Sequence, residues 1–149
     1  MQKILIPRLT LAAAWLLVGN SLFAHDDAAL DKVKGSHGGQ LRMAGSYHFE
    51  LVVASDGMEA KDRPITVYLT DHADQQVPAA GTAGTATILA GRTKTTVALT
   101  SAGGNKLMGV GKYAVDPQMK VVVSASFPNG KTEQARFTPL ATPVADGAR

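Results

Sequence analysis

The chain has 149 residues, no cysteine and a formal net charge of +3 at pH 7. Without cysteine it has no disulfide bond and no thiolate metal site, so its fold must depend on packing and hydrogen bonding. Two of the 15 basic residues lie in the first 24 positions, which leaves 15 − 2 = 13 basic against 12 acidic residues. This balance gives no indication of a nucleic-acid partner or of an anionic membrane surface as a partner.

Residues 1–24 have the pattern of a secretory signal. Lys3 and Arg8 precede an apolar run, and small and polar residues then lead to a candidate cleavage site after Ala24. The apolar run is shorter than the roughly 20 residues that a membrane-spanning helix needs. We therefore expect a periplasmic protein that begins at His25 and has no membrane attachment after cleavage, with an uncleaved anchor as the alternative.

The rest of the chain reads as one β-rich domain. Residues 25–36 are charged and are expected to form a flexible N-terminal arm, and the domain itself is expected to span residues 37–138. Alternating or β-branched runs, separated by turns rich in Gly, Asn, Asp and Pro, predict strands over 47–53, 65–70, 85–89, 93–99, 106–110, 119–126 and 131–137. An eighth strand, 39–43, is expected if it forms a hairpin with 47–51. Residues 139–149 are expected to form a disordered tail.

This spacing of strands predicts an all-β fold. The favoured form is an immunoglobulin-like antiparallel β-sandwich of about seven or eight strands, and a small barrel is the alternative. The carboxylates are spread singly, and no nucleophile elbow or phosphate-binding loop occurs. We therefore do not expect an enzyme.

The histidines are the residues most suited to chemistry, and all four lie in the first half of the chain: His25, His37, His48 and His72. In the absence of cysteine, imidazole is the best remaining side chain for a transition metal. His48 and Glu50 are expected on one face of the strand 47–53, with Cα atoms about 7 Å apart. The hairpin would bring His37 near the same strand.

Two histidines and a carboxylate are a common ligand set for zinc, and the thioether of Met43 would suit Cu(I). The sequence therefore predicts a metal site formed by His37, His48 and Glu50. The alternative is that these side chains simply face solvent.

His25 is a further candidate ligand. If cleavage follows Ala24, a free α-amine stands beside the His25 imidazole, and these two nitrogens can chelate Cu(II). His37 or His48 would then complete the site. His72 lies in a predicted turn, and we expect it to be solvated and without an assigned partner.

Several short segments resemble a known group of proteins. They are HGG at 37–39, YHFELV at 47–52, VYLTD at 67–71, GTAT at 84–87 and GKTEQARF at 130–137. Together they resemble small periplasmic proteins associated with bacterial heavy-metal efflux systems, and a segment of the periplasmic adaptor subunits of those pumps. The resemblance implies a β-rich accessory of metal export or tolerance.

Two functions are therefore weighed. The first is a periplasmic accessory protein that binds Cu or Zn in metal tolerance or efflux, with components of an efflux pump as partners. The second is a metal-free β-sandwich interaction module that docks to an exported partner or to an efflux adaptor.

Overall fold

The computed structural model describes Leu30 and residues 33–142, and this part of the chain forms eight strands. They are β1 (Gln40–Ala44), β2 (Tyr47–Val53), β3 (Lys61–Asp71), β4 (Ala83–Ala90), β5 (Thr93–Ser101), β6 (Lys106–Tyr113), β7 (Lys120–Ser126) and β8 (Thr132–Phe137). The prediction of an all-β antiparallel fold of about seven or eight strands is confirmed. The predicted signal segment 1–24 and His25 lie outside the described residues. Within those residues no helix has the length and apolarity needed to cross a membrane.

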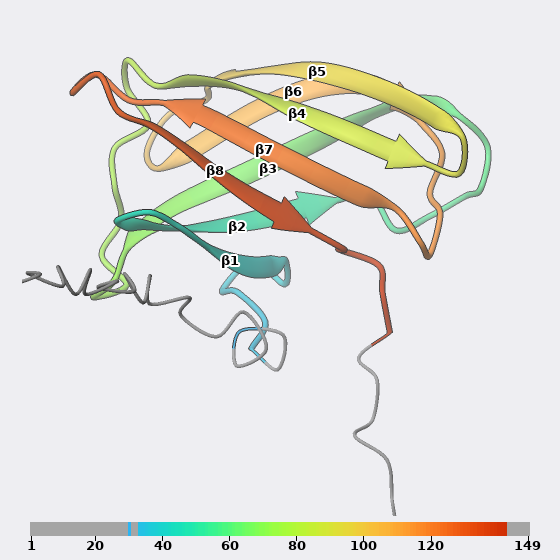
Figure 1. The fold of residues 1–149 in the computed structure, drawn as a ribbon, viewed down its shortest axis with the longest axis horizontal. Helices are drawn as coiled ribbons and strands as arrows, with labels where there is room; N and C mark the ends of the chain where they lie inside the picture. The colour runs from blue at the N-terminus through green and yellow to red at the C-terminus, as the bar shows by residue number, and fades with distance from the viewer. Residues whose placement is uncertain (1–29, 31–32, 143–149) are drawn as a thin grey trace, which may run out of the picture.

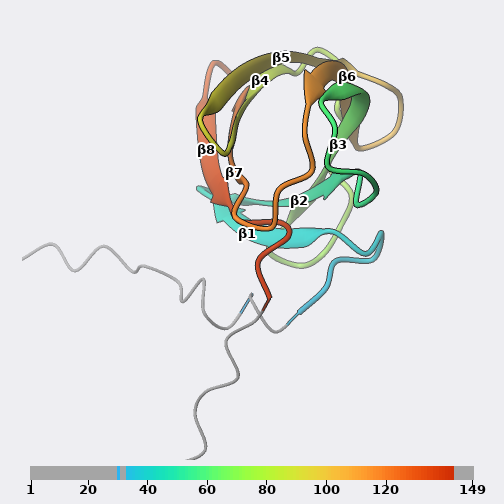
Figure 2. The same cartoon turned by 90° about the vertical axis from the view of Figure 1, so that its right-hand side faces the viewer.

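The strands form one curled sheet in the order β1-β2-β3-β6-β5-β4-β7-β8, and every neighbouring pair is antiparallel. Two four-stranded halves are connected by β5 and β6, whose ladder has only the pairs Thr100↔Met108 and Ser101↔Leu107. Figure 2 shows the strands surrounding a central axis, with β8 returning to the side of β1. The fold is therefore of the sandwich or barrel type, with its core between the two halves.

The core follows from the two-residue alternation of the strands. In β3, Ile65, Val67 and Leu69 are fully buried, whereas the residues between them lie on the outer face of the sheet. Phe127, in the turn after β7, covers one end of the core and stacks on Tyr47 with ring centroids 4.2 Å apart. Each large apolar side chain that is fully buried stabilises the fold by about 1.5–3 kcal/mol.

Two glycines permit the close approach of β5 to β6. A Cβ atom on Gly109 would collide with the carbonyl oxygen of Ala98, and one on Gly111 would collide with the side chain of Val97. Val97 is buried and packs over this glycine surface. The two halves of the sheet can therefore meet at this corner although their ladder is short.

The opposite side closes without a ladder between β1 and β8 in the described residues. There the backbone N–H of Thr138 donates to Oε1 of Gln40 at 2.8 Å. Leu140 packs against the core, so the packed body extends beyond the boundary predicted at residue 138. At the other end, Lys34 forms a β-bridge with Gln40, and the predicted flexible arm is therefore bound to the sheet by residue 34. Figure 1 shows both segments leaving the same side of the molecule.

Candidate functional site

Glu50 lies on the outer face of β2, yet its side chain is only 5% exposed. Its Oε1 accepts hydrogen bonds from the backbone N–H of His37 at 2.7 Å and of Gly39 at 3.0 Å. Its Oε2 lies 2.8 Å from Nδ1 of His37. The carboxylate therefore holds the segment that precedes β1 against the sheet, and we call this arrangement the Glu50 clasp.

The segment 35–39 is shaped to enclose that carboxylate. Gly38 N–H donates to the carbonyl oxygen of Gly35 at 2.9 Å, and Gly38 has a φ of +77°, which favours glycine. A Cβ atom on Gly35 would collide with the carboxyl group of Glu50, and one on Gly39 would collide with the backbone of Leu51. Gly35 and Gly39 are thus needed because the backbone there lies directly against Glu50 and Leu51, and Gly38 because of its positive φ.

The ring of His37 covers the clasp from outside. It stacks on Tyr68, the β3 neighbour of Glu50, with ring centroids 3.5 Å apart and an interplanar angle of 1°. The pairing of His37 with Glu50 that the hairpin predicted is present. Two backbone N–H groups already donate to one carboxylate oxygen, and Nδ1 of His37 lies 2.8 Å from the other, so this pair holds the loop against the sheet.

His48 lies two residues before Glu50 on the same face but contacts different residues. Its side chain is 13% exposed, and its Nδ1 atom is buried without a hydrogen-bond partner. The nearest carboxylate oxygen, Oδ1 of Asp74, is 3.6 Å from this nitrogen, and the ring of His72 stacks over the His48 ring at 5.0 Å. His72 is exposed as expected, and the structure gives it a neighbour, His48, that the sequence did not assign.

The turn after β3 positions His72 and Asp74. Oδ1 of Asp71 accepts hydrogen bonds from the N–H groups of Ala73 at 2.8 Å and Gln75 at 2.9 Å, and Asp74 N–H donates to the Asp71 carbonyl at 3.0 Å. Asp74 has a φ of 58°, a conformation that aspartate tolerates better than most residues. The turn is therefore braced by its own hydrogen bonds, and it holds both side chains beside β2.

The predicted trio does not meet at one point. His37 and Glu50 form the clasp, whereas His48 faces His72 and Asp74, and we call these last three residues the His48 cluster. Across the described part of the chain, no group of three or more His, Cys, Asp or Glu side chains is arranged to hold a metal ion as it stands. A site at the His48 cluster would need movement of the exposed His72 ring.

The amino-acid sequence alone did not identify His72 and Asp74 as neighbours of His48. The signal was present in the DHAD turn at 71–74, but its use required the register of β2 on β3, in which His48 pairs with Thr70. That register places the turn beside His48.

Comparisons of the chain with models of known protein families, with curated proteins and with solved structures gave no match.

Proposed function

We propose that this protein binds one transition-metal ion, Cu or Zn, through the His48 cluster. The observation that carries the proposal is the Nδ1 atom of His48, which is buried and has no hydrogen-bond partner. Leaving a buried polar atom unsatisfied costs about 1–3 kcal/mol. A buried polar atom of this kind calls for an explanation, and the binding of an ion or of an ordered water is one explanation.

The spacing of the donors supports this explanation. At 3.6 Å, Oδ1 of Asp74 is too far from Nδ1 of His48 for a good hydrogen bond. Two ligands of one tetrahedral zinc ion, each about 2.0 Å from the metal, lie about 3.3 Å apart. The observed separation is thus closer to that of two ligands of one ion than to that of a hydrogen-bonded pair.

The types of donor also fit. Two imidazoles and a carboxylate suit Zn(II) and Cu(II). Met43 is the cross-strand partner of His48 on β1, and side chains in directly opposite positions have Cβ atoms about 4.5–5.5 Å apart. Its thioether adds a soft ligand that would favour Cu(I). Metal binding at this cluster then does not require the other ligands predicted from the sequence, which are His37, Glu50 and the N-terminal nitrogens of His25.

The cellular role is a proposal that rests on the sequence. The signal-like segment 1–24 and the resemblance to efflux-associated periplasmic proteins support an exported accessory of metal tolerance. In this role the protein buffers the ion or passes it to a pump component.

Calorimetric titration of tag-free protein beginning at His25 with Zn(II), Cu(II) and Cu(I) tests the proposal. We expect His48→Ala, His72→Ala and Asp74→Asn each to weaken binding by at least about tenfold, which is about 1.4 kcal/mol. His37→Phe is the matched control, because it removes another imidazole but keeps an aromatic ring on Tyr68. Unchanged affinity in His48→Ala would overturn the proposal, and loss of binding only in His25→Ala would move the site to the N-terminus.

A further inference from the structure

A second feature lies on the half of the sheet away from the histidines. The outer face of β5, β4, β7 and β8 carries an open groove of about 420 Å³. Its outward-facing lining includes Leu89, Lys94, Lys120, Val122 and Arg136. Leu89 is 43% exposed and lies near the end of β4, between the neighbouring strands β5 and β7. The groove therefore presents an apolar floor to solvent.

The register places positive charges on both sides of that floor. Lys94 on β5 and Lys120 on β7 are the two cross-strand partners of Leu89 on β4. In the next row, Arg136 on β8 is the partner of Val122. Because neighbouring strands are about 4.8 Å apart, the Cα atoms of the two lysines lie about 10 Å from each other with Leu89 midway.

The charges of Lys94, Lys120 and Arg136 are not paired within the described residues. All three are exposed, and no acidic residue lines the groove. The ion pairs that the structure describes involve His37, His48, Lys61 and Arg63, so Lys94, Lys120 and Arg136 belong to none of them. A chain with a net charge close to zero after residue 24 thus gathers cations at one apolar groove.

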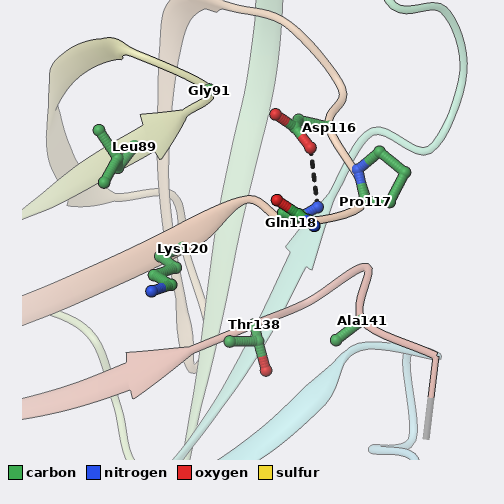
Figure 3. A pocket seen from close by; sticks show the side chains of 8 residues that line it. All are labelled: Leu89, Gly91, Asp116, Pro117, Gln118, Lys120, Thr138 and Ala141. Atoms are coloured by element: carbon green, nitrogen blue, oxygen red, sulfur yellow. Dashed lines mark hydrogen bonds between the residues drawn. The ribbon is translucent and has the colours of Figure 1, made fainter.

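The groove continues into a second one. Leu89, Lys120 and Thr138 line both, and Figure 3 shows these three side chains in a row across neighbouring segments. Asp116 lines the second groove, and its carboxylate accepts a hydrogen bond from the N–H of Gln118 at 2.8 Å. The two grooves therefore share one border, formed by Leu89, Lys120 and Thr138.

We infer that this groove docks an acidic segment of a partner polypeptide in an extended conformation. Groove-facing residues of an extended peptide lie about 6.8 Å apart, so a Glu-x-Leu-x-Glu segment crossing the strands places its leucine over Leu89. Its two carboxylates then flank that position at about 7 Å on each side, within reach of the flexible side chains of Lys94 and Lys120.

Two other classes of partner fit less well. Single-stranded nucleic acid needs exposed aromatic rings for base stacking, and the one aromatic residue of the lining, Phe137, is 2% exposed. A bilayer surface takes up an apolar face that protrudes into it, whereas here the apolar residues form the floor of a depression between the cations.

Fluorescence anisotropy with a fluorescein-labelled Glu-Ser-Leu-Ser-Glu peptide tests the inference. The measurement uses protein beginning at His25 in the presence of a chelator, so the result is independent of the proposed metal site. The peptide should bind. One variant peptide has both Glu residues replaced by Gln and the other has Leu replaced by Ser, and each should bind at least about fivefold more weakly. Raised salt should weaken binding, because the contact is electrostatic and exposed.

Charge reversal of the protein provides the second arm. Lys94→Glu with Lys120→Glu should weaken peptide binding by at least about tenfold. The matched control is Lys112→Glu with Lys131→Glu, which makes the same change of charge at exposed positions outside the groove. Equal loss in both double variants, or no binding of the peptide, would overturn the inference. So would binding to phosphatidylglycerol vesicles without binding to the peptide, since the groove would then be a lipid site.

Discussion

Replacement of Glu50 tests whether the clasp is structural. In Glu50→Leu, the N–H groups of His37 and Gly39 lose their acceptor, and Nδ1 of His37 loses its contact with the carboxylate. A hydrogen bond to a charged group contributes about 1.5–3 kcal/mol. Because the loop can detach and let water reach these donors, we count only the two backbone bonds at the low end of that range, which gives a loss of about 3 kcal/mol.

Glu50→Gln separates the carboxylate charge from the shape of the side chain. The amide oxygen still accepts from both backbone N–H groups, so the expected loss is only about 1 kcal/mol. Urea unfolding followed by circular dichroism measures both variants, and the larger loss corresponds to a fall in Tm of about 12 °C for a domain of this size. Glu59→Leu is the control, since Glu59 is exposed.

The same two variants distinguish the clasp from a metal ligand. If Glu50 acts only as the clasp, Glu50→Gln should bind Zn(II) or Cu(II) within about twofold of the wild-type affinity, well under the 1.4 kcal/mol of a tenfold change. A Glu50→Leu protein as stable as wild type, or a tenfold loss of metal affinity in Glu50→Gln, would refute the structural role.

Three further predictions follow from other parts of the structure. Gly109→Ala should destabilise the fold by about 1–3 kcal/mol in urea unfolding, because the added Cβ atom collides with the backbone of β5. Met108→Ala is the control: Met108 is the exposed neighbouring residue, and its replacement should cost less than about 0.5 kcal/mol. Asp71→Ala should weaken metal binding at the proposed His48 cluster in calorimetry, because it removes the acceptor that holds the turn in place. Unchanged affinity would show that the conformation of this turn does not matter for metal binding. Burial raises the pKa of Tyr113 above its ordinary 10.0, so the unfolded chain loses this proton first. Stability should therefore be complete below pH 10 and fall as the pH rises through the folded pKa, and Tyr113→Phe should flatten that slope in urea unfolding.

The strands could be predicted because alternation is a local property of the chain. The strand predicted over 47–53 is β2 as observed, and the apolar positions on its inner face alternate with His48 and Glu50. β3 is longer than the predicted 65–70 and begins at Lys61. Pro64 is tolerated there because the β2 ladder ends at the pair Val53↔Ile65, so β3 has only one neighbour at that point.

The candidate site could be predicted only in part. Histidine content and the shared face of His48 and Glu50 are visible in the sequence, and so is the nearness of His37 through a hairpin. What the sequence does not show is that Glu50 is already occupied by the N–H groups of the segment 35–39. These hydrogen bonds depend on the conformation of the loop, in which Gly38 has a positive φ and Gly35 and Gly39 lie in close contact with β2.

The sequence by itself determined the fold class, the lack of disulfides and the residue types able to bind a metal, because these depend on composition and on spacing over a few residues. The tertiary structure alone decided which side chains meet. The register of β2 on β3 brings His48 to His72, and the order β5-β4-β7 places Lys94 and Lys120 on either side of Leu89. Such contacts depend on strand order and on the cross-strand pairing of residues distant in the chain, and a shift of one residue would turn each of these side chains to the other face.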